Sequence, residues 1–404
     1  MAMGVLRGNG TQGNPWIVED GWDLNALRNL PTTEFQWVEI ANNISLAMFA
    51  NWIPIPSTRL NINGNGNVIS DLFINSSGVN TGLFAELISQ ETRNIVLDGE
   101  IVCSLNSNQG AGMLCGNIAW HVTGSTTPQF SVFSNIQCFG SIIANAAGAI
   151  VGVGGCFGRT FLQSNLTVSI EDCTFHGSLL FSTTHSSTLS PSNTQFRVCA
   201  GILGNGDSNS AAVNARVSIA RCKTVAKYSV SGGPSPTGIS GIFGGGRQST
   251  SSSICRCIAR NELQFTNSAV TTQPVWFGGI VSIAVNDSSI VSCGALTDVN
   301  YNPLFGIGGL HVAGIHCMRP SGTSPVTTSY AVIDFVNPNN VSLPATFSMR
   351  GLGGNITTTS SFFDTTVLAL GWNGDVIGSE FGRTTAQLQS RAFLESQGWV
   401  FANV

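Results

Sequence analysis

The chain of 404 residues has 42% hydrophobic and 9% charged side chains, 47 glycines and a formal net charge of −4 at pH 7. The hydrophobic share excludes a disordered Gly/Ser-rich chain, because it supplies enough apolar surface to form a core. The net charge and the presence of only two lysines, Lys223 and Lys227, exclude the basic surface that nucleic-acid binding needs.

Residues 1–59 are expected to form a leading segment that caps one end of the molecule. A helix over about residues 22–30 is predicted, because Asp20 or Asp23 can serve as its N-cap and Pro31 follows it. Its apolar side consists of Trp22, Leu24, Leu27 and Leu30. Residues 1–13 lack the basic start and apolar run of a secretory signal peptide, so we expect any export to use another route.

Residues 60–370 are predicted to be a series of repeats marked by glycine. A turn made of a glycine and, in most copies, two apolar residues recurs at intervals of 30 to 46 residues. Its glycines are Gly82, Gly112, Gly155, Gly201, Gly241, Gly279 and Gly314. Because loop-closure entropy grows slowly with loop length, uneven spacing is compatible with a repeat.

A second signature, Ile-x-x-Cys, recurs between the glycine turns. Its copies end at Cys173, Cys222, Cys257 and Cys293, and residues 133–136 fit the same pattern with a larger residue in place of Cys. The simplest interpretation is a ladder of small inward-facing residues. Disulfide rungs and metal ligands are the alternatives, although none of the eleven cysteines forms a Cys-x-x-Cys pair, which disfavours a zinc site.

Each repeat offers two or three short segments in which apolar and polar residues alternate, as in residues 222–230, and this is the pattern of β-strands. A single repeat has no partner for its apolar face, so equivalent repeats must stack, with Ile over Ile and Cys over Cys. Each buried Ile or Phe would contribute about 1.5–3 kcal/mol. We therefore predict an all-β fold, a right-handed parallel β-helix (β-solenoid) with short capping helices at both ends.

The most apolar stretch of the chain is residues 141–157. Four glycines interrupt it, and it is short for a bilayer span. It therefore predicts two buried strands joined by a turn, and no membrane span.

Residues 371–404 are expected to cap the other end, with a helix over about residues 385–397. Thr384 and Gln387 form a capping-box pattern at its start, and Gly398 is a typical helix stop. A stack of repeats needs such a cap, because an open last repeat presents unpaired backbone groups.

Several segments, in the same order along the chain, resemble the GLUG-motif repeat β-helix proteins. Residues 10–17 and the helix after them resemble that family's first strand and helix, and residues 60–74 resemble its Asp-Gly-x-Gly segment, which leads into the Gly-Leu-Phe turn at residues 82–84. Residues 361–366 resemble its aromatic-aromatic-Asp-Thr step, and residues 384–388 with 398–401 resemble its closing helix. The resemblance covers nearly the whole chain and implies a β-helix displayed on a surface.

The sequence predicts no catalytic, cofactor-binding or metal-ligating residue. It has no Gly-x-Ser-x-Gly nucleophile elbow and no His-Glu-x-x-His motif, and residues 64–66 fit a turn and not a dinucleotide site. The five histidines, His121, His176, His185, His311 and His316, are dispersed. Only the last two are close in sequence, and ordinary strand or loop positions are expected for both in preference to metal binding.

Two pairs of carboxylates bear on a possible polysaccharide depolymerase, since some β-helix enzymes carry acidic residues on their surface. Asp98 and Glu100 are two residues apart and could share a face of a strand. Alternatively, these two carboxylates only keep the edge of a strand charged and solvated. Glu171 and Asp172 are adjacent and would face opposite sides, so they are expected to be a poor catalytic pair.

We predict a non-enzymatic structural and binding protein, most simply a phage or virus virion component such as a tail fibre, a tailspike-like protein or a capsid decoration protein. Assembly in the reducing host cytoplasm would account for the many cysteines. Expected partners are other virion proteins or further copies of the chain, with a trimer favoured, and a cell-surface glycan. The alternatives are a bacterial cell-surface adhesin, which would be extracellular, and a polysaccharide depolymerase.

Overall fold

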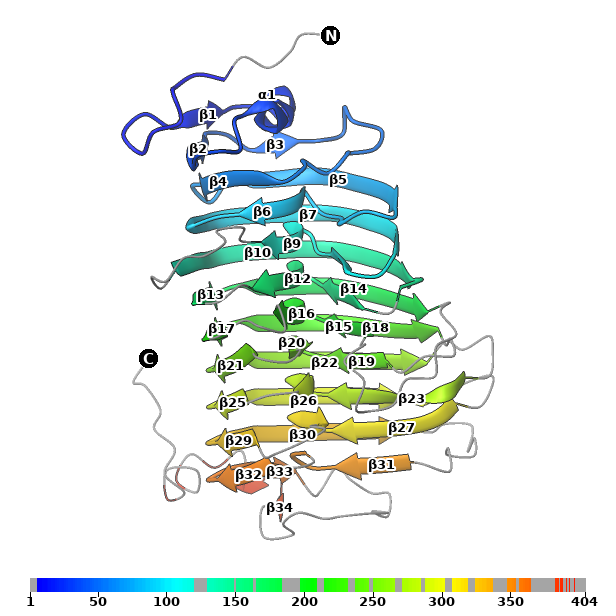
Figure 1. Ribbon diagram of the computed structural model, residues 1–404. Coiled ribbons are helices and arrows are strands. Elements are labelled where there is room, and N and C mark those ends of the chain that lie inside the picture. The colour runs from blue at the N-terminus through cyan, green and yellow to red at the C-terminus, as the bar shows by residue number, and fades with distance from the viewer. Residues whose placement is uncertain are drawn as a thin grey trace.

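The computed structural model describes residues 6–119, 129–148, 150–162, 165–183, 197–208, 214–231, 237–246, 250–265, 271–284, 288–301, 307–318, 324–336, 347–353, 356–364, 382–384, 386–387, 390, 392 and 396. Within these ranges most residues lie in parallel β-strands, as the stacked arrows of Figure 1 show. The main helical elements are α1 (Gly21–Ala26) and the 3-10 helix η1 (Leu27–Asn29). The predicted all-β class is therefore confirmed.

The strands form four ladders, and each full repeat of the chain adds one strand to ladders 1, 2, 3 and 4 in that order. Ladder 1 holds β1 (Trp16–Val18), β2 (Gln36–Ile40), β4 (Thr58–Asn63), β13 (Leu166–Glu171), β17 (Ala215–Ala220), β21 (Thr250–Cys255), β25 (Ser288–Val291), β29 (Ser324–Thr327) and β32 (Ile356–Thr359). Ladder 2 holds β3 (Ile44–Ser45), β5 (Val68–Ser77), β14 (Thr174–Thr183), β18 (Lys223–Ser231), β22 (Ile258–Phe265), β26 (Gly294–Asn300), β30 (Tyr330–Val336), β33 (Phe362–Asp364) and β34 (Gly382–Arg383). Two long strands, β7 (Glu91–Leu105) and β10 (Gln129–Ala146), run through both ladders.

Ladders 3 and 4 complete the repeat. Ladder 3 is a seven-stranded sheet of β8 (Gln109–Ala111), β11 (Val151–Gly154), β15 (Arg197–Ala200), β19 (Thr237–Ser240), β23 (Thr271–Gly278), β27 (Ile307–Ala313) and β31 (Phe347–Arg350). Ladder 4 contains β6 (Phe84–Ile88), β9 (Cys115–Ala119), β12 (Phe157–Leu162), β16 (Leu203–Ser208), β20 (Phe243–Gly246), β24 (Val281–Ala284) and β28 (His316–Met318). Residues 141–157 were predicted to hold two strands, and this is confirmed. The first is the end of β10, the second is β11, and residue 157 begins β12.

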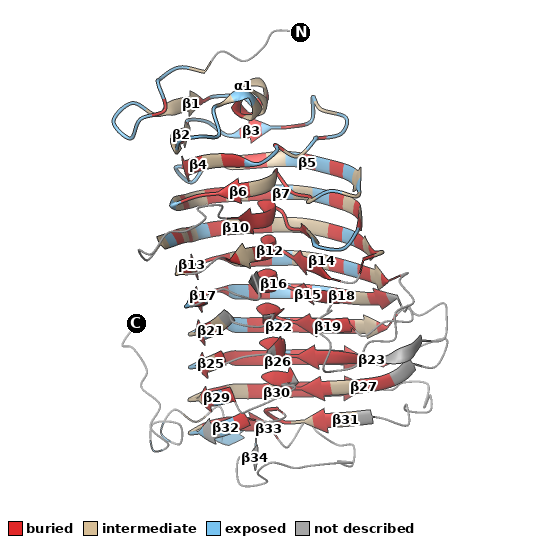
Figure 2. Ribbon diagram, viewed as in Figure 1, coloured by how far each residue is buried: buried red, intermediate tan, exposed pale blue. Residues whose placement is uncertain are grey.

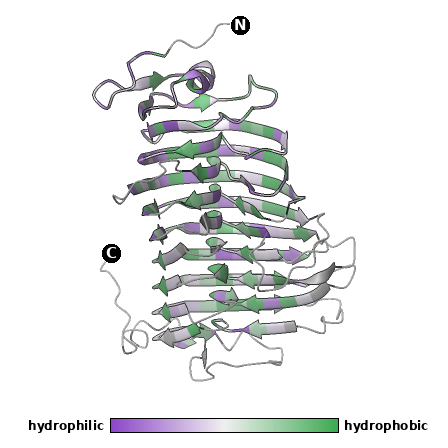
Figure 3. Ribbon diagram, viewed as in Figure 1, coloured by the Kyte–Doolittle hydropathy of each residue, from purple (hydrophilic) through white to green (hydrophobic). Residues whose placement is uncertain are grey.

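Large apolar side chains, most of them Ile, stack along ladder 1. Phe133 is in register with Ile170, and the same row continues through Ile219, Ile254 and Ile290, all of them buried. The predicted stacking of Ile over Ile is therefore confirmed. One continuous hydrophobic cluster extends from Val18 to Phe363. Buried residues alternate with less buried ones along many strands (Figure 2), and hydrophobic residues alternate with more hydrophilic ones (Figure 3).

A left-handed residue turns the chain between ladders 1 and 2. The residues at this corner are Asn94, Asn135, Asp172, Arg221, Arg256, Ser292, Thr328 and Ser360, with φ between 48° and 56°. The next residue points inward, and it is this residue that forms the cysteine ladder. The Sγ of Cys222 donates to the carbonyl oxygen of Ala220 at 3.4 Å and approaches that of Ile170, one repeat earlier, at 3.6 Å.

All eleven cysteines are free thiols, and all except the half-buried Cys255 are buried. This confirms the interpretation of the cysteines as small inward-facing residues for ten of the eleven. The alternative of disulfide rungs is wrong in this structure, because the corner cysteines are all free thiols, and their Sγ atoms also approach backbone carbonyl oxygens.

The repeated glycine turns join ladder 3 to ladder 4, where successive turns lie almost in contact. The backbone N–H of Gly279 donates to the carbonyl of Ala313, and that of Ile280 donates to Ile315, both at 3.0 Å. A Cβ atom added at Gly279 would lie 1.9 Å from the carbonyl oxygen of Gly314. Glycine is therefore required by the close approach of two backbones.

The N-terminal end is covered by α1 and η1, where the helix over about residues 22–30 was predicted. The Asp20 side chain caps α1 by accepting from the backbone N–H groups of Trp22 and Asp23, at 2.8 and 2.9 Å. The stacking starts earlier than the expected boundary at residue 60, because β1 already pairs with β2, and β2 with β4. The leading segment thus contributes strands as well as a cap.

Most of the expected C-terminal cap, residues 371–404, lies outside the described residues. The capping box at its start is present, since the backbone N–H of Thr384 donates to Gln387 Oε1 at 3.0 Å and that of Gln387 donates to Thr384 Oγ1 at 3.3 Å. Residues 386, 387, 392 and 396 are helical, and the other positions of the predicted helix over residues 385–397 are not described, apart from the non-helical residue 390. No helix among the described residues has both the length and the apolar character needed to cross a membrane.

Candidate functional site

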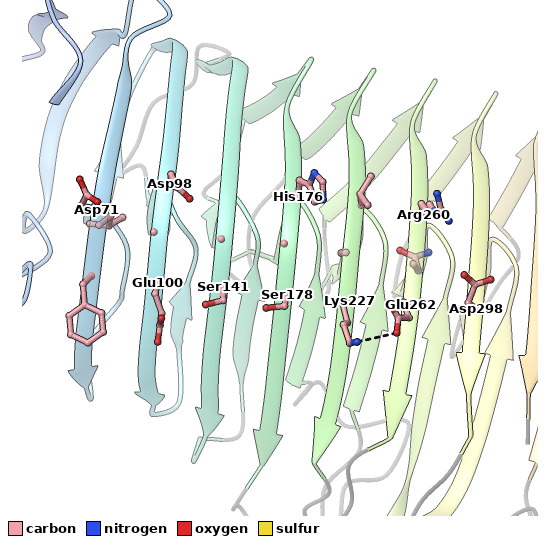
Figure 4. A pocket seen from close by; sticks show the side chains of 18 residues that line it. Asp71, Asp98, Glu100, Ser141, His176, Ser178, Lys227, Arg260, Glu262 and Asp298 are labelled. Atoms are coloured by element: carbon pink, nitrogen blue, oxygen red, sulfur yellow. Dashed lines mark ion pairs between the residues drawn. The ribbon is translucent and has the colours of Figure 1, made fainter. Parts of the chain in front are cut away.

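An open groove of about 990 Å³ crosses the outward face of ladder 2 at right angles to its strands (Figure 4). It runs over β5, β7, β10, β14, β18, β22 and β26, which pair side by side in that order. We name it the axial groove, because it follows the direction in which the repeats stack. Each of these seven strands therefore contributes residues to it at equivalent or nearby positions.

The floor of the axial groove is a row of residues whose side chains are absent or point into the core. Gly99, Gly140 and Gly177 are in register with Ala226 and Asn261 on the next strands. Ala226 and Asn261 are buried. Gly140 has a φ of 119°, and a Cβ atom there would lie 1.9 Å from the carbonyl oxygen of Gly99, so this part of the floor requires glycine.

The two walls of the axial groove are the residues immediately before and after the floor on each strand. Because side chains alternate along a strand, both neighbours of an inward-facing position point outward. Wall A consists of Asp98, His176, Val225 and Arg260, all of them exposed. Wall B consists of Glu100, Ser141, Ser178, Lys227, Glu262 and Asp298, which are exposed or half-buried.

The end of the axial groove nearer the N-terminus is acidic and carries an exposed aromatic ring. Asp71 sits at a bulge of β5 with a φ of 60°, and its Oδ2 accepts hydrogen bonds from Ser45 at 2.6 Å and Ser70 at 2.9 Å. These two hydrogen bonds lower the pKa of Asp71. Phe73, two residues further on, is 38% exposed.

The other end combines cationic and acidic side chains. Lys227 Nζ lies 3.2 Å from Glu262 Oε1, which also accepts from Gln264 Nε2 at 2.6 Å. Asp298 is in register with Glu262 on the next strand. Desolvation raises the pKa of Asp298, and the neighbouring carboxylates of Asp334 and Glu262 add to this effect. Hydroxyl, carboxylate and guanidinium groups thus line one channel, an arrangement suited to hydrogen bonding with a polyhydroxylated ligand.

The structure brings Asp98 and Glu100 to the axial groove, where both point outward on either side of Gly99. The expectation that they share a face is confirmed. Their environment does not resemble that of a catalytic pair in glycoside hydrolases, where one acid is held in a desolvated site, because both side chains are exposed.

The expectation that Glu171 and Asp172 face opposite sides is wrong. The strand ends at Glu171, and Asp172 has the left-handed corner conformation, so the alternation of a strand no longer applies. Both carboxylates reach Arg221 of the next repeat. The distances from its Nη2 atom are 2.7 Å to Glu171 Oε2 and 2.8 Å to Asp172 Oδ2. This ion pair joins two corners and lies outside the axial groove.

Two of the five histidines, His121 and His185, lie outside the described residues. His311 Nδ1 lies 2.6 Å from Ser348 Oγ, and its ring stacks on Trp276 at a centroid distance of 6.2 Å. His316 is buried on β28. In the part of the chain that is described, no group of three or more His, Cys, Asp or Glu side chains is arranged to hold a metal ion.

Sequence reasoning missed most of the residues that line the axial groove, including His176, Lys227, Arg260, Glu262 and Asp298. A signal for part of it is present, because residues 97–100, 138–141 and 175–178 share the order buried residue, outward residue, glycine, polar residue. Their alignment in one row depends on the register between repeats of unequal length, which the sequence alone does not supply.

No protein-family model matches the chain, and no curated protein matches it. A similar solved structure is the crystal structure of "a putative immunoglobulin A1 protease from Bacteroides ovatus". The two chains are 14% identical, the match covers 86% of each, and the TM-score is 0.52. At this identity the similarity concerns the fold alone.

Proposed function

We propose that the chain is a non-enzymatic structural and binding component of a virus particle, folded as a right-handed parallel β-helix. A tail fibre, a tailspike-like protein and a capsid decoration protein are the forms considered. The observation that carries the proposal is the axial groove on the outward face of ladder 2, in a stack whose four ladders surround one continuous core. Such a stack holds binding residues of many repeats in fixed positions, as a rigid receptor-binding surface requires.

The state of the cysteines supports assembly in the host cytoplasm. Ten thiols are buried, and the corner thiols are used as hydrogen-bond donors to backbone carbonyls. A reducing compartment keeps such thiols free during folding, whereas an oxidising one promotes disulfides. A particle released by lysis would carry a protein folded under reducing conditions to the outside of the cell.

Kinship with the GLUG-motif repeat proteins is part of the same proposal. The glycine turns that suggested it lie at equivalent corners, since Gly241, Gly279 and Gly314 bond to one another's turns in successive repeats. The similarity in fold to the Bacteroides ovatus structure is compatible with a β-helix and brings no activity to this chain.

Mass spectrometry of purified particles tests the location. We expect peptides of this chain in particles banded on a density gradient, and gold-labelled antibody on the particle surface. A chain that is absent from particles and enriched in the outer-surface fraction of cells would overturn the virion proposal and establish the adhesin alternative.

A homo-oligomer, with a trimer favoured, belongs to this proposal. Phe130 is 61% exposed on ladder 1, at another hollow of about 600 Å³ that is otherwise lined largely by serines such as Ser251 and Ser253. A large exposed aromatic side chain on a weakly charged face favours contact with another copy. Light scattering should give a mass in solution of three times the chain mass of 42.3 kDa. The Phe130→Ser variant should have a lower mass in solution. A native chain that is monomeric would contradict the trimer.

A polysaccharide depolymerase is the second candidate, because of one pair of carboxylates in the axial groove. Glu262 forms an ion pair with Lys227, whereas Asp298 on the next strand has a raised pKa. The two carboxyl groups thus have different environments, as a general acid and the second catalytic carboxylate of a glycoside hydrolase require. Release of reducing ends from capsular or exopolysaccharide, lost in Glu262→Gln and Asp298→Asn, would replace the non-enzymatic proposal. No release by the native protein would exclude it for these substrates.

A further inference from the structure

The shape of the axial groove identifies the kind of ligand that fills it. It spans seven paired strands, from β5 to β26. At about 4.8 Å between neighbouring strands, its length is roughly 29 Å. A compact small molecule would contact only two or three repeats, whereas an extended polymer lying along the stack would contact all seven strands.

The charges of the axial groove narrow the class of polymer. Five carboxylates line it, namely Asp71, Asp98, Glu100, Glu262 and Asp298, against two permanent cations, Lys227 and Arg260. Lys227 is already paired with Glu262. This excess of negative charge repels nucleic acids, uronate polymers and sulfated glycans, so a neutral polymer is favoured.

The polar and aromatic groups then point to a glycan. Carboxylates accept hydrogen bonds from two neighbouring hydroxyl groups, and the guanidinium of Arg260 donates to ring and hydroxyl oxygens. Ser141 and Ser178 are in register on neighbouring strands, between Glu100 and Lys227. Phe73 presents an exposed ring, and His176 presents its ring on the opposite wall, where it lies 6.4 Å from the ring of Phe139. The rings of Phe73 and His176 can pack against the apolar faces of sugar rings.

We propose that the axial groove binds a neutral polysaccharide strand that runs parallel to the stack, with one or more sugar units over each pair of strands. This inference rests on the proposed function as a binding surface and assigns its ligand. Asp98 and Glu100 accept hydrogen bonds from sugar hydroxyls at one end, Arg260 and Lys227 donate near the other, and the glycine floor lets the sugar rings approach the backbone.

Affinity electrophoresis of the full chain tests this assignment, with gels containing neutral glucans, mannans and galactans of different linkage, and polygalacturonate and heparin as anionic probes. We expect retardation by at least one neutral polymer and by neither anionic one. For the neutral polymer that binds, affinity should rise with length from disaccharide to hexasaccharide, because successive units reach further strands.

Two variants locate the binding. Asp98→Asn with Glu100→Gln keeps the exposed surface shape and should weaken binding by about tenfold or more, because charged acceptors are lost. Ser178→Trp should block the middle of the groove and abolish retardation. Glu34→Gln, which changes an exposed carboxylate outside the groove, is the matched control and should bind as the native chain does.

Three results would overturn the ligand assignment: no retardation by any neutral polymer of the panel, retardation by the polyanions, or unchanged binding by both groove variants. The particle test is independent of these outcomes. A chain present in particles that fails the glycan test would disprove the ligand and leave the proposed function standing.

Discussion

At the corner between ladders 1 and 2, thiol and hydroxyl side chains have the same structural role. Cys293 donates to the carbonyl oxygen of Val291 at 3.4 Å, and Ser329, at the equivalent position of the next repeat, donates to that of Thr327 at 3.0 Å. Both residues follow a left-handed residue, and this corner places the inward thiol or hydroxyl against the carbonyl two positions earlier. The corner cysteines are therefore structural donors, and their reactivity should be low.

Thiol labelling tests this conclusion. Burial raises the pKa of Cys103 and of Cys317 to about 12, and the thiolate is the reactive form. We expect one rapidly modified thiol per native chain, the half-buried Cys255, and eleven after unfolding in guanidinium. Cys255→Ser should remove the rapid phase, and a rapid phase that persists in this variant would contradict the assignment.

The ion pair of Arg221 with Glu171 and Asp172 predicts a pH-dependent contribution to stability. Hydrogen bonds lower the pKa of both carboxyls, with Ser169 and then Arg221 acting on Glu171, and Arg221 acting on Asp172. Groups with a lowered pKa stabilise the folded state above their unfolded pKa values, 4.5 and 3.8, and this contribution is lost as the pH falls through the lowered values.

Arg221→Ala is accordingly expected to lower Tm at pH 7, with a difference from the native chain that shrinks as the pH falls below 4.5. The change is small, because all three side chains are partly exposed. Calorimetry across this range measures it, with Arg216→Ala on the neighbouring strand as the control. A Tm difference that grows toward low pH would have the wrong sign for this explanation.

At the scale of elements, the glycine turns between ladders 3 and 4 determine how closely repeats stack. Gly279→Ala places a methyl group against the Gly314 carbonyl oxygen, which is backbone and has no rotamer to change. We expect a loss of about 2–3 kcal/mol or more in the free energy of unfolding, measured by urea denaturation. Gly13→Ala, where nothing lies within 4 Å, should change it by no more than about 0.5 kcal/mol; equal effects of the two substitutions would refute the close-approach argument.

The elements also show what could be predicted from sequence and what could not. The strand class, the Ile row and the inward cysteines follow from local patterns that repeat in each unit. The corner residues do not, because Arg221, Arg256 and Thr328 have left-handed backbones without being glycine or asparagine. Asp98 and Glu100 were found by their spacing, whereas Glu262 and Asp298 face one another only through the pairing of β22 with β26.

At the scale of the whole molecule, the stack depends on a closed N-terminal end. Leu24 and Leu27 of the α1 and η1 segment are buried against the same core as Val18 of β1. Without this cover, the first rung would expose apolar side chains and backbone groups that can pair with another chain.

Leu27→Asp is therefore expected to lower the urea midpoint and to cause end-to-end association, because it places a carboxylate in an apolar site. Light scattering and urea unfolding measure the two effects. Asn29→Asp, an exposed position of the same segment, is the control. A Leu27→Asp protein with native size and native midpoint would show that the cap is dispensable.

The in-register pairing of the ladders gives the molecule a modular length. Duplication of one complete repeat would insert one strand into each ladder, extend the rod by about 4.8 Å and leave its cross-section unchanged. The same duplication would add one pair of wall positions to the axial groove. The length of the groove and the number of its proposed sugar subsites would therefore increase together, by one step for each repeat. Relatives of different size should therefore differ in length by whole repeats, and their cross-sections should be nearly the same.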